Sequence, residues 1–226
     1  MSLRRLAAVL LVAGTGLFAV SKEGIMDAGQ TVELTGAEQL SVLRFARQCL
    51  TAHLELEPRP VFPQEAWTSS LRQKAACFVT LTSSGELRGC ILDGFVPHES
   101  IVENVARNVV LAATVDTRFP QVRASEMSHL TIEVSVLSRP QPLTFRDGED
   151  LKTRLRPGVD GVILTTTYGS STFLPQVWEQ LPRVEDFLGE LCRKHGAPRE
   201  CWRTKDLLRV EVYQVQHFSE AGDAAH

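Results

Sequence analysis

The chain has 226 residues, of which 43% are hydrophobic and 23% charged, a composition ordinary for one globular unit or two small ones. The formal net charge of -3 gives no general attraction to phosphate backbones, so nucleic acid is not an expected partner. Five cysteines without a CxxC pair predict neither a disulfide framework nor a zinc finger. We expect reduced thiols, with Cys49, Cys77 and Cys192 serving as small apolar residues.

Residues 1–25 contain a hydrophobic stretch at the start of the sequence. Two arginines precede a mostly apolar stretch of about fifteen residues, the composition of a signal-peptide core and short for a membrane span. Met26 then opens what reads as a complete globular N-terminus. We interpret residues 1–25 as an upstream extension of a cytoplasmic protein. The alternative is export or membrane anchoring through this segment.

The first predicted elements are a helix and a hairpin. Apolar residues recur at helical spacing over residues 37–54, and Thr35 with Glu38 forms the pattern of a capping box at the start of this helix. A proline-rich loop follows. Residues 77–82 and a second extended segment ending near Cys90 flank a Ser-Ser-Gly turn, which predicts a β-hairpin with Cys90 on its second arm.

The middle of the chain predicts a helix and then a strand. Ile101, Val105 and Val109 share one helical face, with His98 or Ser100 near the start of this helix. Apolar residues at alternate positions over residues 130–136 are typical of a half-buried strand.

The second half of the chain is predicted to contain a short helix, turns and a strand over residues 162–167. A helix over residues 185–195, which ends at Gly196, and one closing strand near residues 207–218 follow. Residues 219–226 read as a polar tail. Helices and strands mix without a regular βαβ alternation. The expected fold class is therefore α+β, with a mainly antiparallel sheet and flanking helices.

The segment LRGC at residues 87–90 is the strongest candidate site. A thiolate is the reacting form of cysteine, Arg88 beside Cys90 would stabilise it, and Gly89 would permit close substrate approach. The competing interpretation is a glycine-kinked strand whose cysteine is buried and inert. No second ligand lies at metal-binding spacing, so no metal is predicted at Cys90.

Other polar residues are weaker candidates. His98 could act as a base if its loop folds back, but histidines near a helix start are commonly exposed. Glu133 would face away from its apolar neighbours and could move protons or point to solvent. Asp160 is explained most simply as a turn residue. Gln176 is the one polar contact candidate within an apolar run.

Four segments, in this order along the chain, resemble the AMMECR-type domain family, in particular its members that act as protein A of the AmmeMemoRadiSam system. They are ELRGCIL, IEVSVLSRPQPL, GVDGVIL and STFLPQVWEQLPRVEDFLGELCRKHGAPRECW. The resemblance covers residues 34–218. It implies a larger and a smaller subdomain with a cleft between them, to which the LRGC segment contributes. It also implies a Memo-type protein and a radical-SAM protein as partners in a modification or biosynthetic step of unidentified substrate.

The resemblance carries the family's LRGCIG onto residues 87–92, with Leu92 in place of the last glycine. This departure removes backbone freedom just after the thiol. The candidate catalytic residues are Cys90, Arg88 and Glu133, and the candidate substrate- or partner-binding residues are Gly89, Ile91, His98, Asp160 and Gln176. The sequence contains no cofactor fingerprint, so none is predicted.

Two hypotheses follow from different classes of protein. In the first, the chain is an enzyme or enzyme component in which Cys90 is a nucleophile or covalent carrier, Arg88 stabilises the thiolate, and Glu133 moves protons. In the second, the chain is a non-catalytic module that docks a partner or ligand and uses the LRGC turn for shape.

Overall fold

The computed structural model describes residues 32–221, which separate into two compact units. Among the described residues, the larger unit comprises residues 32–138 and 216–221, and the smaller unit comprises residues 139–215. The expected extension at residues 1–25 lies outside the described residues. The predicted cleft between two subdomains stays a prediction.

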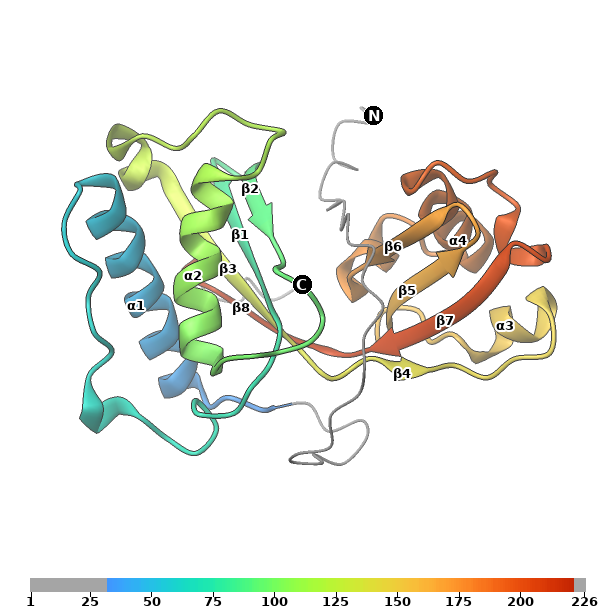
Figure 1. The fold of residues 1–226 in the computed structure, drawn as a ribbon, viewed down its shortest axis with the longest axis horizontal. Helices are drawn as coiled ribbons and strands as arrows, with labels where there is room; N and C mark the ends of the chain where they lie inside the picture. Colours follow the sequence, from blue (N-terminus) through green and yellow to red (C-terminus); the bar gives the residue numbers. More distant parts are fainter. Residues whose placement is uncertain (1–31, 222–226) are drawn as a thin grey trace. The chain divides into compact units, whose positions relative to one another are not determined.

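The larger unit is a four-stranded antiparallel sheet covered by two helices (Figure 1). The strand order is β2-β1-β3-β8. Along the chain its elements are α1 (Gly36–Leu54), η2 (Gln64–Ala66), β1 (Cys77–Ser83), β2 (Glu86–Ile91), α2 (Ile101–Thr114), η3 (Ala124–His129), β3 (Leu130–Leu137) and β8 (Val215–Ser219).

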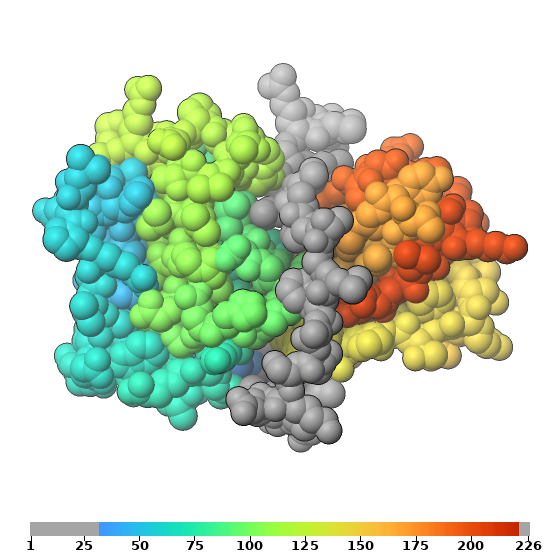
Figure 2. Space-filling view, in the orientation of Figure 1, coloured from blue at the N-terminus to red at the C-terminus, as the bar shows by residue number. Residues whose placement is uncertain are grey.

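Both helices of the larger unit begin at the side-chain caps that their sequences predict. Thr35 and Glu38 form the expected capping box of α1, and the Ser100 hydroxyl accepts the Glu103 backbone amide at the start of α2. The apolar faces of α1 and α2 pack on the same face of the sheet, where Val79, Ile132 and their neighbours are fully buried. Figure 2 shows the outer surfaces of α1 and α2 side by side.

The smaller unit has its own antiparallel sheet, in the order β4-β7-β5-β6. Along the chain its elements are β4 (Gln141–Pro142), α3 (Gly148–Arg154), β5 (Gly161–Thr166), β6 (Gly169–Phe173), η4 (Pro175–Glu179), α4 (Val184–Lys194), η5 (Cys201–Arg203) and β7 (Leu207–Tyr213). Trp178 stacks on Phe187 in its core, with ring centroids 3.6 Å apart. The α+β class with antiparallel pairing and flanking helices is confirmed.

The single closing strand predicted near residues 207–218 is wrong, because the structure divides it into two strands. β7 pairs with β5 as far as Tyr213, and after Gln214 the chain continues as β8 at the edge of the other sheet. Apolar alternation indicates which face of a strand is buried, but not which strand lies beside it.

The prediction of five reduced cysteines is also wrong, because Cys192 and Cys201 form a disulfide. Their Cα atoms lie 6.1 Å apart, within the range that a disulfide bridges. Cys192 is buried as expected, but it packs in the core as half of a covalent pair. The other three cysteines, Cys49, Cys77 and Cys90, are buried thiols.

The expected polar tail begins later than residue 219. Ser219 ends β8, and the Glu220 carboxylate accepts hydrogen bonds from Arg47 on α1 and from the Ile132 backbone amide. Arg47 also donates to the Leu130 carbonyl at 2.7 Å. These bonds hold the end of β8 against α1 and β3. Within residues 32–221, no helix has the length and apolar character needed to cross a membrane.

Candidate functional site

Cys90, Thr80 and Glu133 lie in one row across three neighbouring strands of the larger unit. Thr80 on β1 is opposite Cys90 on β2 and opposite Glu133 on β3. Directly opposite residues place their side chains on the same face of a sheet. Because Val79 and Ile132 face the helices, this row lies on the face that α1 and α2 do not cover.

Cys90 contacts a hydroxyl through its side chain and a charged pair through its backbone amide. Its sulfur is 3.1 Å from the Thr80 hydroxyl oxygen, and its backbone amide donates to Asp116 Oδ2 at 2.9 Å. Arg118 donates to both oxygens of the same carboxylate, and its pKa is raised mainly by this pairing and to a smaller extent by the nearby Cys90. The thiol is therefore close to a guanidinium, although only 3% of the residue is exposed.

Gly89 fits the strand closely against α2. A Cβ atom at this position would lie 2.2 Å from the backbone oxygen of Ala112. No side chain can occupy that space, so the glycine is required for β2 to approach α2. The role of Gly89 is thus explained by packing on the helix side of the sheet, opposite to the thiol.

Arg88 pairs with residues that follow α2, although its place in the sequence predicts that it stabilises the Cys90 thiolate. The pairing of β1 with β2 shifts between Leu81 and Thr82, which places Arg88 at an irregularity in the strand. Its guanidinium pairs with Glu126 at 2.8 Å and donates to the Pro120 carbonyl at 2.9 Å. Arg88 therefore fastens the segment after α2 to β2.

The other predicted residues of the larger unit lie in different environments. Ile91 packs against the core under the helices. His98 is exposed in the loop before α2, where Ser100 is the cap. Glu133 is half-buried and accepts a hydrogen bond from Thr82 at 3.3 Å. Leu92 is buried, and its backbone is not among the positive-φ residues of the described chain.

Asp160 and Gln176 belong to the smaller unit. Asp160 is 2% exposed and its carboxylate accepts bonds from the backbone amide and the guanidinium of Arg156, which makes it the turn residue that its simplest interpretation suggests. Its carbonyl accepts the Trp178 indole at 2.8 Å. The Gln176 Oε1 atom is buried without a hydrogen-bond partner among the described residues.

Sequence reasoning missed Thr80, Asp116 and Arg118. Asp116 is 26 residues from Cys90 and follows the end of α2, so no local pattern connects the two. Burial opposes ionisation of Asp116, but hydrogen bonds from Arg118 and from the Cys90 amide outweigh this effect and lower the pKa of the carboxyl group. Asp116 is therefore a carboxylate at neutral pH that fixes both the thiol's backbone and the nearby guanidinium.

The spacing of Cys90, Thr80 and Glu133 limits which of these side chains can exchange a proton directly. Neighbouring strands lie about 4.8 Å apart, so Cys90 and Glu133, two strands apart, are separated by roughly 10 Å at the backbone. Glu133 is too far to take a proton directly from the thiol, but both groups could contact one small substrate lying over Thr80. No group of three histidine, cysteine or acidic residues within residues 32–221 is arranged to hold a metal ion.

These features define an α+β protein with a thiol on the helix-free face of an antiparallel sheet. Residues 43–218 match the sequence pattern of the AMMECR1 family. A protein of Methanothermobacter thermautotrophicus is 33% identical over 195 residues, covering 84% of this chain and 97% of that protein. A protein of Thermococcus gammatolerans is 34% identical and covers 79% of this chain and 88% of its own length.

A solved structure shares the fold as well. The crystal structure of the uncharacterized protein PH0010 from Pyrococcus horikoshii is similar with a TM-score of 0.71 at 31% identity, covering 82% of this chain and 92% of that one. The chain belongs to the AMMECR1 family.

The close approach at Gly89 predicts the effect of adding a methyl group. Gly89→Ala should destabilise the protein by about 3 kcal/mol, because the new Cβ would overlap the Ala112 carbonyl and separate β2 from α2. Urea unfolding measures this loss. The matched control is Gly36→Ala, where the added Cβ meets open space and stability should change by less than about 0.5 kcal/mol. Equal effects at both positions would contradict the packing role of Gly89.

The Asp116 carboxylate predicts a pH-dependent stability difference. Its folded pKa lies below the unfolded value, so its contribution is present above the unfolded pKa and is lost as the pH falls through the folded pKa. Asp116→Asn should lower the free energy of unfolding by about 1–2 kcal/mol at pH 7. Denaturant titrations between pH 7 and pH 2 should show this difference shrinking under acid. A constant difference would exclude the charged form as its source.

Proposed function

We propose that the protein acts as protein A of an AmmeMemoRadiSam-type system, together with a Memo-type protein and a radical-SAM protein. In this proposal Cys90 is the reacting group, a nucleophile or covalent carrier in the step that the three proteins share. The observation that carries it is the position of Cys90, whose sulfur lies 3.1 Å from the Thr80 hydroxyl and whose backbone amide donates to the Asp116 carboxylate that also binds Arg118. The system and its partners rest on the sequence resemblance described above.

The proposed roles follow from the contacts in the larger unit. Arg118, held by Asp116, takes the role that the sequence suggested for Arg88, because a fixed positive charge near a thiol favours the thiolate. Thr80 can donate a hydrogen bond to that thiolate. Glu133 faces the same side and would contact the far end of the substrate or exchange a proton with it.

A second candidate function is a binding module without covalent chemistry. It is favoured by the structural roles of two LRGC residues, since Gly89 makes room for α2 and Arg88 is paired with Glu126. The low exposure of Cys90 is consistent with it too. The two functions differ in one measurable property, the reactivity of Cys90 in the folded protein.

Alkylation of the native protein by iodoacetamide tests the role of Cys90. We expect labelling of Cys90 at neutral pH, and about tenfold slower labelling in Arg118→Ala, because the nearby positive charge favours the thiolate. Arg118→Lys should retain much of the rate, and Arg88→Ala should change it little. Peptide mass spectrometry reads each thiol separately.

Cys77 is the internal control for that experiment. It is fully buried, and desolvation raises the pKa of its thiol, so it should be labelled only after unfolding. If native Cys90 is as inert as Cys77, the nucleophile role is wrong and the binding module is the better explanation.

The partner proteins are tested separately. Purified protein should form a stoichiometric complex with the Memo-type or radical-SAM protein of the same organism, measured by size-exclusion chromatography with light scattering. The Cys90→Ser variant should still form this complex, because the serine leaves the surface nearly unchanged. In the presence of both partners and cell metabolites, only the wild-type protein should become covalently modified at residue 90, which is detected as an increase in mass. If no complex forms at micromolar concentrations, the proposal that the protein acts in an AmmeMemoRadiSam-type system is wrong.

A further inference from the structure

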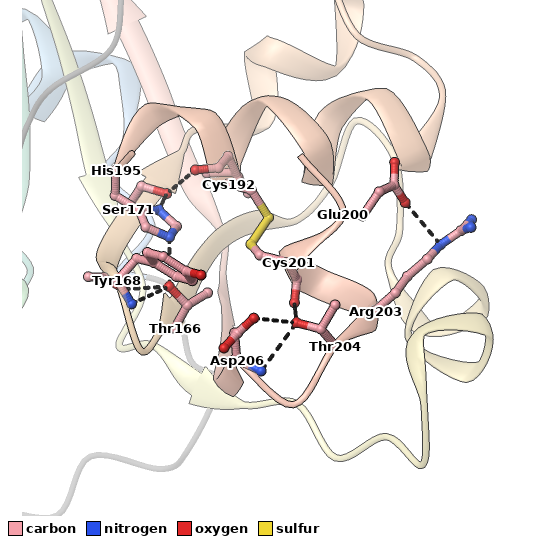
Figure 3. Close-up of a disulfide and its surroundings, with 12 residues drawn as sticks. Thr166, Tyr168, Ser171, Cys192, His195, Glu200, Cys201, Arg203, Thr204 and Asp206 are labelled. Atoms are coloured by element: carbon pink, nitrogen blue, oxygen red, sulfur yellow. Dashed lines mark hydrogen bonds and ion pairs between the residues drawn. A yellow bond between two sulfur atoms is a disulfide. The ribbon is translucent and has the colours of Figure 1, made fainter. Parts of the chain in front are cut away.

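The disulfide of the smaller unit joins the last turn of α4 to η5 (Figure 3). Cys192 and Cys201 are 0% and 1% exposed and belong to the core beneath α4. It is the only cysteine pair joined within residues 32–221, where Cys49, Cys77 and Cys90 remain thiols. An oxidised pair and buried thiols therefore occur in the same molecule.

The segment between the two bridged cysteines, residues 193–200, is partly exposed. Exposed residues recur through it, namely Arg193, Gly196, Pro198 and Glu200. A local opening of residues 193–200 would expose the sulfurs without disturbing the rest of the core. Such local openings require much less free energy than global unfolding.

Contacts other than the disulfide also hold this segment. The Ala197 amide donates to the Cys192 carbonyl at 3.0 Å, which closes the end of α4 around Gly196 at a φ of +81°. Arg199 forms ion pairs with Asp186 and Glu190 on α4. Because these contacts do not depend on the sulfur–sulfur bond, we expect the reduced form to remain folded.

His195 connects the bridged segment to the β5–β6 hairpin. Its Nε2 atom lies 2.9 Å from the Thr166 hydroxyl on β5, and its Nδ1 atom lies 2.9 Å from the Ser171 hydroxyl on β6. The Ser171 hydroxyl donates to the Leu191 carbonyl of α4 at 2.7 Å, so it accepts a hydrogen bond from His195 Nδ1. Figure 3 shows the imidazole ring between the two hydroxyls.

We propose that Cys192–Cys201 is a redox-responsive staple that sets how firmly His195 holds the β5–β6 hairpin. In the oxidised state both ends of residues 192–201 are fixed, and His195 is held against Thr166 and Ser171. In the reduced state the segment opens more often, and the hairpin loses this support. The proposal uses no property of Cys90 and does not depend on the function proposed above.

The reductant is a dithiol, either a protein with a dithiol site or a small molecule. One thiolate of the dithiol attacks a cysteine sulfur, forming a mixed disulfide and releasing the other cysteine as a thiolate that takes up a proton. The second thiol of the dithiol then displaces the first cysteine. The protein gains two electrons and two protons, and the dithiol becomes a disulfide.

The test uses the full-length protein equilibrated with mixtures of reduced and oxidised dithiothreitol. Alkylation and peptide mass spectrometry measure the fraction of Cys192 and Cys201 reduced, and amide hydrogen exchange is measured on the same samples. We expect one two-electron transition while the protein stays folded. Exchange should become at least about tenfold faster in residues 193–201 and 166–171, while residues 77–91 of the larger unit change little.

Two variants separate the staple from general destabilisation. The double variant Cys192→Ser/Cys201→Ser should show the hydrogen-exchange pattern of the reduced protein, and adding the dithiol should not change it. Ser171→Ala should loosen the hairpin in both redox states, so that reduction adds little there. The proposal is overturned if the pair is reduced only when the whole protein unfolds, or if reduction leaves exchange in residues 166–171 unchanged.

Discussion

The contact between Gly89 and the Ala112 carbonyl is the constraint on which the larger unit depends. It allows β2 to lie directly on α2, and the position of β2 in turn sets which face of the sheet carries Cys90. The start of β1 is held by a second device, because Asn104 accepts the Cys77 amide and Asn108 donates to the Cys77 carbonyl inside the core. Helix α2 thus positions two strands from one side, leaving the other side open to polar residues.

The residues of the LRGC segment have separate structural roles. Gly89 serves helix packing, Arg88 ties down the segment after α2, and Cys90 projects to the opposite face. Alternation along the strand places Gly89 and Cys90 on opposite faces, and the irregularity in the pairing at Arg88 lets that residue turn to Glu126. A short motif of this kind can therefore combine requirements of folding and of chemistry, and its residues need not act on one another.

Local signals made much of the fold predictable. Thr35 with Glu38 marked the start of α1, and Gly196 marked the end of α4, because caps and left-handed glycines act within one turn of the chain. The charged partner of the thiol was not predictable in this way. Arg118 reaches Cys90 through Asp116, and only the packing of α2 against β2 brings them together. The Cys192–Cys201 pair was missed for a similar reason, since two cysteines nine residues apart do not form a CxxC pair and only the packing of η5 beneath α4 brings them together.

The placement of β8 has a consequence for how the chain is made. The smaller unit is inserted between β3 and β8, so the larger unit receives its last strand only after residues 139–215 have been synthesised. Until then β3 has an unpaired edge, and Arg47 on α1 lacks the carboxylate of Glu220. On the ribosome, the inserted unit can complete its own sheet first, and the larger unit, although it contains α1, is the last to close.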